Sequence, residues 1–187
     1  MRRALLVFAL IAAPALAAEV AGVQVGDRAR VDSSELVLNG AGLRTKYFLS
    51  IYVAGLYLTE KKASPADILA LTGAKRITMH LMRGVSAKQL TDALELGIRS
   101  NTTPAEREAL KDRLGELTDI MDAIQTAKKG DLIALDWIPG TGTRIVLNGE
   151  SRGKVISGED FYRALLRIWL GDQPAQESLK KALLGGG

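Results

Sequence analysis

The stretch from Tyr47 to Leu58 constrains the fold most strongly, because it is apolar on both faces of any strand that it forms. Alternation places on one face Tyr47, Leu49, Ile51, Val53 and Tyr57, and on the other face Phe48, Ser50, Tyr52, Leu56 and Leu58. We therefore expect the strand to be buried on both sides. Arg44 precedes it, either as a solvated surface residue or as the one fixed charge at the end of an apolar cavity, and the second alternative would be a ligand site.

The first 17 residues have the layout of a secretory signal peptide. Arg2 and Arg3 precede an apolar run from Ala4 to Ala13, and Ala15-Leu16-Ala17 supplies small residues at the two positions that a signal peptidase reads. We expect cleavage after Ala17 and export to a bacterial periplasm, with an uncleaved anchor as the alternative. Residues 18–187 are then predicted to form one soluble domain without a stable membrane anchor.

The composition argues against several classes of function. Without Arg2 and Arg3 the formal net charge falls from +4 to +2, which gives no support to nucleic-acid binding. The absence of cysteine excludes disulfides, thiolate metal sites and cysteine nucleophiles. His80 is the only histidine, so neither a metal site nor a catalytic triad is expected. Gly40-x-Gly42 lacks the third glycine of a dinucleotide site, and we expect no cofactor.

The rest of the chain alternates between strand and helix patterns. Strands are expected as short pieces over 20–38, over 75–83, as a hairpin over 132–147 and over 154–156, and the glycines of 39–44 are expected to form a turn. Capping residues at Ser64, Ser86 and Thr103 predict three helix starts, and apolar spacing predicts helices over about 157–170 and 174–183. This order favours an α+β fold with a mainly antiparallel sheet backed by helices.

Three segments form a recognisable combination. They are the turn Asn39-Gly40-Ala41-Gly42-Leu43-Arg44, the strand end Gly55-Leu56-Tyr57-Leu58, and the helix from Phe161 to Gly171 that continues into Asp172-Gln173-Pro174. Together they resemble the chalcone isomerase-like family. The resemblance spans nearly the whole mature chain and is closest to the small exported bacterial members. It implies an open-faced β-sandwich, in which helices cover one face of a large antiparallel sheet and a ligand cleft lies between the two layers.

In the plant enzymes of this family, which cyclise chalcones to flavanones, the arginine of the turn stabilises the phenolate nucleophile. Arg44 matches that position, and an ever-protonated guanidinium suits such a role. The enzymes carry further polar residues where this chain has Tyr52, Leu90, Gly97 and Ile168. These differences remove most groups that would position a polyphenol, so an isomerase (intramolecular lyase) with Arg44 as its catalytic residue is the alternative interpretation.

The non-catalytic branch of the family binds fatty acids, and there the same arginine and a tyrosine on the next strand hold the carboxylate. Arg44 and Tyr52 match that pair. A guanidinium and a phenol can satisfy both carboxylate oxygens while aliphatic walls enclose the tail. We therefore interpret the chain as a binder of a fatty acid or another apolar carboxylate, with a site formed by Arg44, Tyr52, Leu90, Gly97 and Ile168.

Two other interpretations remain open on the sequence alone. Tyr52 could be an ordinary core residue, and Arg44 could cap a turn or pair with a surface acid. Separately, the exposed helices could dock another component of the cell envelope, and the protein would then be a partner-binding protein.

Overall fold

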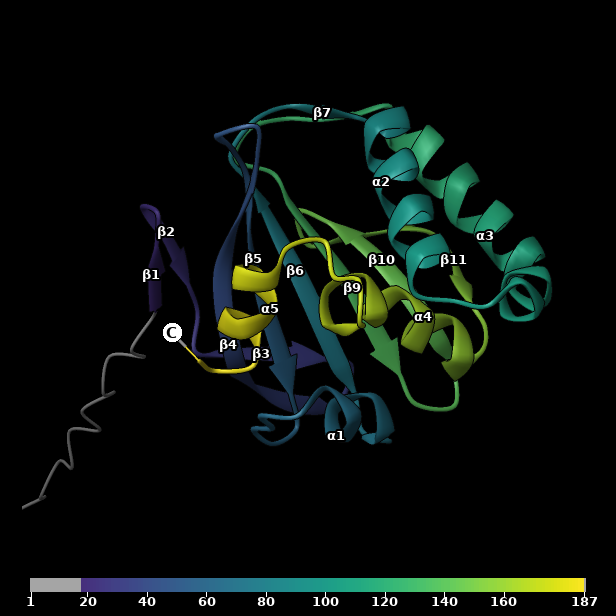
Figure 1. Cartoon of the computed structure of the whole chain (residues 1–187), viewed down its shortest axis with the longest axis horizontal. Helices are drawn as coiled ribbons and strands as arrows, with labels where there is room; N and C mark the ends of the chain where they lie inside the picture. The colour runs from purple at the N-terminus through teal and green to yellow at the C-terminus, as the bar shows by residue number, and fades with distance from the viewer. Residues whose placement is uncertain (1–17, 187) are drawn as a thin grey trace, which may run out of the picture.

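A seven-stranded antiparallel sheet forms the centre of the structure (Figure 1). The computed structural model describes residues 18–186, and the predicted signal peptide lies outside the described residues. The strand order is β11-β10-β9-β6-β5-β4-β3. The strands are β3 (Arg28–Val31), β4 (Ser34–Lys46), β5 (Leu49–Leu58), β6 (Lys75–Leu81), β9 (Leu132–Ile138), β10 (Gly142–Leu147) and β11 (Glu150–Ile156). The prediction of a large antiparallel sheet is therefore confirmed.

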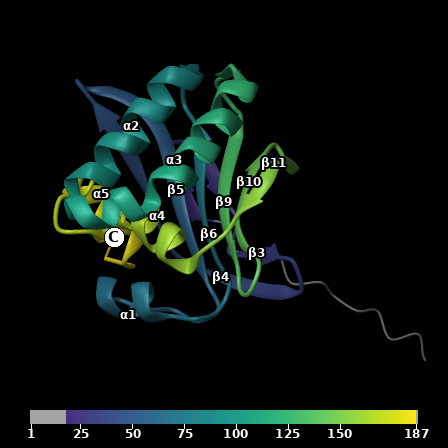
Figure 2. The same ribbon diagram turned by 90° about the vertical axis from the view of Figure 1, so that its right-hand side faces the viewer.

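Five helices lie on one face of this sheet (Figure 2). They are α1 (Pro65–Ala70), α2 (Ala87–Ser100), α3 (Pro104–Ile124), α4 (Glu159–Leu170) and α5 (Glu177–Leu183). The predicted caps are present, since the Ser64, Ser86 and Thr103 hydroxyls each accept a backbone N–H of the first turn. Within residues 18–186, no helix combines the length and the apolar composition needed to cross a membrane.

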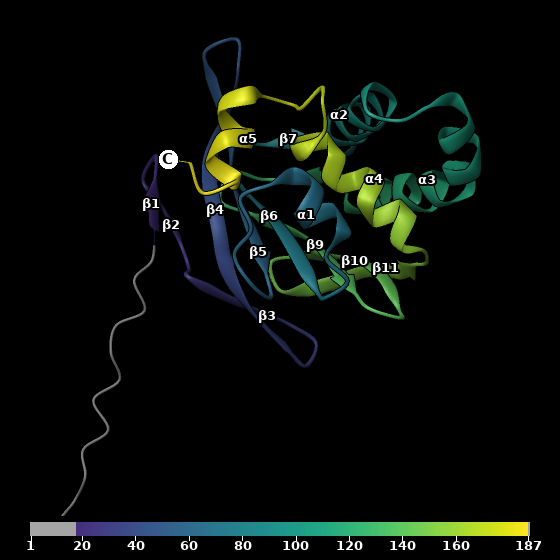
Figure 3. The ribbon, with the colours of Figure 1, turned by 60° about the horizontal axis from the view of Figure 1, so that its bottom comes forward.

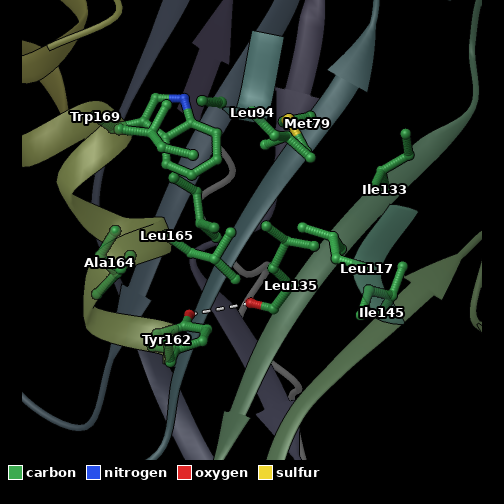
Figure 4. Packing of buried hydrophobic residues seen from close by; sticks show 14 of the residues in the cluster. Met79, Leu94, Leu117, Ile133, Leu135, Ile145, Tyr162, Ala164, Leu165 and Trp169 are labelled. Atoms are coloured by element: carbon green, nitrogen blue, oxygen red, sulfur yellow. Dashed lines mark hydrogen bonds between the residues drawn. The ribbon is translucent and has the colours of Figure 1, made fainter. Parts of the chain in front are cut away.

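The two faces of the sheet bury separate apolar clusters, as the sequence of β5 requires. Leu56 and Leu58 join the larger cluster beneath the helices, whereas Val53 and Tyr57 join a smaller one on the opposite face. The small cluster is covered by the hairpin of β1 (Ala18–Val20) and β2 (Val23–Val25). In the large cluster, α4 packs on the sheet and the Tyr162 hydroxyl donates to the Leu135 carbonyl over 3.0 Å (Figure 4).

The predicted turn at Asn39–Arg44 is wrong, because this segment lies inside the continuous strand β4. Its glycines serve the packing of α5 instead. A Cβ at Gly40 would collide with the carbonyl of Ala182, and a Cβ at Gly42 would lie 2.7 Å from the Ala182 Cβ. The two glycines therefore let α5 approach the backbone of β4 directly.

The turn between β4 and β5 falls instead at Tyr47 and Phe48, so the strand predicted from Tyr47 begins at Leu49. Lys46 pairs with Leu49, which leaves a two-residue loop with φ of 49° at Tyr47 and 65° at Phe48. Two-residue loops of this kind favour Asn-Gly, because both positions are left-handed. Tyr47 is 83% exposed and Phe48 is fully exposed, so neither aromatic ring is stabilised by burial.

The helices α2 and α3 form an excursion between two neighbouring strands. β6 ends at Leu81 and pairs with β9, which begins at Leu132. At the base of the excursion, β7 (Val85–Ser86) pairs with β8 (Thr126–Ala127). In Figure 1 this short pair lies at the same end of the molecule as the β4–β5 turn.

Lys75 is a charged residue on the face of the sheet that bears the large apolar cluster. Its side chain is fully buried, and its Nζ has no hydrogen-bond partner among the described residues. Burial lowers the pKa of Lys75 from 10.5 to about 8, opposed in part by the charge of Glu159. The folded state therefore carries a cost for this ammonium group at neutral pH.

We expect Phe48→Gly to stabilise the fold. Glycine adopts the left-handed conformation without the penalty of about 1–2 kcal/mol that other residues bear, and loses part of this gain through its freer unfolded chain. The free energy of unfolding in urea should rise by about 0.5–1 kcal/mol. Phe48→Ala is the control, since it removes the ring but keeps the Cβ, and equal gains in both variants would contradict the backbone explanation.

We expect Lys75→Met to stabilise the fold in a pH-dependent manner. In the parent the folded-state pKa lies below the unfolded one, so the unfolded state holds the extra proton and stability rises between about pH 8 and 10.5. The variant lacks this cost and should gain roughly 3 kcal/mol at pH 7, an advantage that shrinks across the same window. Urea unfolding at pH 7 and pH 10 tests it, and a pH-independent difference would contradict it.

Candidate ligand-binding site

A cavity of about 690 Å³ lies between the sheet and the helical layer. Its floor comes from β4, β5 and β6, and its walls come from α2, the end of α4 and the segment 173–175. Apolar side chains dominate the interior, and they include Met79, Leu81, Leu90, Leu94 and Ile168. The cavity therefore offers an apolar chamber of the size that small-molecule sites in proteins have.

Arg44 lies on the floor of this cavity, on the strand β4. Its Nη1 donates to the Thr45 carbonyl over 2.7 Å and to the Gln176 Oε1 over 3.1 Å. No ion pair forms at Arg44 within residues 18–186. The guanidinium is thus held in place by neutral oxygens, and its charge is not compensated by a carboxylate.

Tyr52 lies directly opposite Arg44 in the β4–β5 register, so both side chains project from the same face of the sheet. The Tyr52 hydroxyl accepts a hydrogen bond from the Trp169 Nε1 over 2.9 Å. Burial raises the pKa of Tyr52 above its usual 10.0, while the Trp169 hydrogen bond and the Arg44 charge act in the opposite direction. The phenol therefore keeps its proton at neutral pH.

The other three predicted site residues also line this cavity. Leu90 and Gly97 come from α2 and Ile168 comes from α4. A Cβ at Gly97 would lie 2.7 Å from the Ile168 Cγ2, so the glycine also sets how closely α2 approaches α4. The structure thus brings all five predicted residues together around one cavity, and their role in binding stays a prediction.

The exposed charged residues that line the cavity are more often positive than negative. They are Lys46, Arg83 and Asp92, whose carboxylate is bonded to Lys88 over 2.9 Å, and we call this exposed part of the lining the mouth of the cavity. These charges add to that of Arg44 and favour an anionic ligand. His80 lies on the opposite face of the sheet, and residues 18–186 contain no cluster of side chains suited to hold a metal ion.

Sequence reasoning missed the two side chains that hold the Arg44–Tyr52 pair. Trp169 belongs to the helix segment that carried the family resemblance, but nothing in its spacing indicated a bond to Tyr52. Gln176 precedes α5, and its Oε1 also accepts the Thr45 backbone N–H over 2.9 Å. Only the packing of α5 on β4 brings Gln176 to this strand.

Comparison with known proteins agrees with this architecture. The family model described as chalcone isomerase-like matches residues 17–185. No curated protein matches the chain in sequence. Among solved structures, the crystal structure of the Arabidopsis thaliana fatty-acid binding protein AtFAP1 matches with a TM-score of 0.66 and 16% identity, over 87% of this chain and 92% of that one. The expected fold is confirmed, and the chain belongs to the chalcone isomerase-like family.

Proposed function

We propose that this protein is a non-catalytic binder of a fatty acid or another apolar carboxylate. The observation that carries the proposal is the uncompensated Arg44 guanidinium beside the Tyr52 phenol, both on the floor of an apolar cavity. Arg44 is half-buried and has no anionic partner within residues 18–186, and a carboxylate is the partner that a planar guanidinium binds best.

The hydrogen bonds around the pair favour an acceptor as the ligand's head group. The indole of Trp169 is only a donor, so it uses the Tyr52 oxygen as acceptor and leaves the phenol proton free to donate. Arg44 has no acceptor atom either. A carboxylate can take one hydrogen bond from each residue, whereas a protonated amine would be repelled by the charge of Arg44.

The apolar walls favour a long aliphatic tail. The cavity volume of about 690 Å³ lies within the range of roughly 300–1,000 Å³ that small-molecule sites have. Polar groups that could orient a ring system are scarce, since the family positions at 90, 97 and 168 carry Leu90, Gly97 and Ile168. The free energy of binding would thus come from burial of the tail, with the head fixed by Arg44 and Tyr52.

The fold shared with the fatty-acid binding protein AtFAP1 supports this class of ligand. The signal-peptide pattern of residues 1–17 adds that the binder acts after export, in the periplasm of a bacterium. Only Arg44 supports isomerase chemistry, and the cavity gives no argument for the docking of a protein partner on the helices. We therefore prefer ligand binding to both of these functions.

We expect Arg44→Gln to weaken the binding of dodecanoate by roughly thirtyfold, which corresponds to about 2 kcal/mol for a charge-assisted hydrogen bond. Isothermal titration calorimetry at neutral pH measures the dissociation constant. Arg83→Gln is the matched control, because it removes the same charge from the mouth without touching Tyr52. Equal losses in the two variants would show a general charge effect and would contradict an anchored head group.

We expect Gln176→Glu to weaken dodecanoate binding by at least about tenfold while the fold is kept. The new carboxylate has the shape of the amide and can accept the same hydrogen bond from Arg44, but it neutralises the guanidinium that the ligand needs. The same titration tests it, with Ser178→Ala as a control for the neighbouring contact of Gln176. Unchanged affinity would mean that the head group binds elsewhere.

A further inference from the structure

The tip of the β4–β5 hairpin exposes apolar side chains beside the mouth of the cavity. Phe48 is fully exposed, Tyr47 is 83% exposed and Leu49 is 50% exposed. Tyr47 and Leu49 also line the cavity, whereas Phe48 does not. In Figure 3 the β4–β5 hairpin extends past the elements around it at that end, and its turn is formed by Tyr47 and Phe48.

The backbone of the tip makes these residues unusual. Tyr47 and Phe48 occupy two left-handed positions, with φ of 49° and 65°, where asparagine and glycine fit best. Neither ring gains burial in return. A local arrangement that is both strained and exposed is expected where the residues serve a function other than folding.

Positive side chains lie at the same end of the sheet as the tip. Lys46 lies next to it, with its Nζ 5.6 Å from the centre of the Tyr47 ring. The turn that holds Lys128 and Lys129 is bonded to the end of β6, since the Gly130 N–H donates to the Leu81 carbonyl over 2.8 Å. Both lysines are exposed. With Arg83 at the mouth, these residues present four cations at this end of the sheet.

The acidic side chains of the same end are fewer and mostly engaged. Asp92 is bonded to Lys88, and Asp131 accepts hydrogen bonds from the Asn148 side chain and the Lys128 backbone. Asp122, near the end of α3, and Glu150, which is bonded to Arg152 over 2.8 Å beside Asn148, are the other acids of this end, so four acids face six cations once Lys88 and Arg152 are counted. The balance at this end is therefore positive, and it complements an anionic surface.

We propose that the hairpin tip docks the protein on a lipid bilayer with anionic head groups, with Phe48 and Tyr47 in the interfacial region and the four cations on the head groups. Tyrosine and phenylalanine on a small protrusion suit that interface, and nearby lysine and arginine side chains are attracted by anionic lipids. Docking would let the cavity exchange an apolar ligand with the bilayer, and this purpose rests on the proposed function. Binding to the bilayer itself does not depend on the proposed function.

The size of the tip argues against a second copy of the chain as its partner. The two side chains of the turn and that of Leu49 at the start of β5 offer roughly a few hundred Å² of apolar surface, whereas a stable interface buries about 800 Å² on each partner. A bilayer needs no such area, because a few apolar side chains can insert into its interfacial region without a complementary surface.

Co-sedimentation with vesicles of equal parts phosphatidylcholine and phosphatidylglycerol tests the proposal. The chain starting at Ala18 is used, because the sheet, its helices and both apolar clusters lie within residues 18–186 and the apolar run of 4–13 could itself bind lipid. We expect Phe48→Gly to weaken vesicle binding by about tenfold. Its fold is not at risk, since glycine suits this position, and Val155→Thr is the control for loss of an exposed apolar group elsewhere.

A charge-reversed pair of variants tests the electrostatic part. Lys128→Glu with Lys129→Glu should weaken binding to these vesicles by about tenfold or more and leave binding to pure phosphatidylcholine unchanged. Lys61→Glu with Lys154→Glu is the matched control, because both are exposed lysines on other parts of the chain. Equal effects of the two pairs would overturn the proposed surface.

Dodecanoate titration of the same proteins separates this proposal from the proposed function. Phe48→Gly should bind dodecanoate as the parent does, and Arg44→Gln should sediment with vesicles as the parent does. Vesicle binding that survives Phe48→Gly overturns the docking proposal whatever the dodecanoate result. Self-association that is lost in Phe48→Gly, without any vesicle binding in the parent, overturns it in favour of a second copy.

Discussion

The pairing of β4 with β5 is the interaction on which the rest of the structure depends. It aligns Arg44 with Tyr52 on the face of the sheet that the helices cover. It also carries the apolar residues of β5 to both faces, so that each face needs a cover of its own. The helical layer supplies one cover and the β1–β2 hairpin contributes to the other. The cavity remains where this strand pair extends beyond the buried core, at the end that leads to the hairpin turn.

Close backbone approach fixes the elements around the polar pair. Gly40 and Gly42 bring α5 against β4, and this contact delivers Gln176 to the Arg44 guanidinium. Gly97 brings α2 against Ile168 of α4, the helix that carries Trp169 to the Tyr52 hydroxyl. These glycines, which have no side chain, thus decide where Gln176 and Trp169 lie. The guanidinium is oriented by an amide and the phenol by an indole, which leaves the positive charge available.

Much of the fold could be predicted from local patterns. The helix starts at Ser64, Ser86 and Thr103 follow from capping chemistry, and the two-faced burial of β5 follows from alternation. The segment Asn39–Arg44 was wrongly predicted as a turn, because paired glycines also occur where a helix touches a strand, and that contact is long-range. The actual turn was missed because Tyr47 and Phe48 are residues that favour strands. The positions of the five site residues came from family resemblance, whereas Gln176 carries no local signal at all.

The excursion of α2 and α3 has a consequence for motion. Along the chain these helices come between β6 and β9, and the β7–β8 pair closes the base of the excursion. The seven-stranded sheet consists of two runs of strands, β3 to β6 and β9 to β11, which are joined where β6 pairs with β9. Neither helix takes part in the hydrogen bonds between these strands. Displacement of α2 from the floor would thus break the packing of Leu90, Leu94 and Ile98 in the large cluster, but no hydrogen bond between the seven strands. The cost of opening the chamber would therefore come from the side-chain packing of α2 on its neighbouring helices and on the floor, and not from strand pairing.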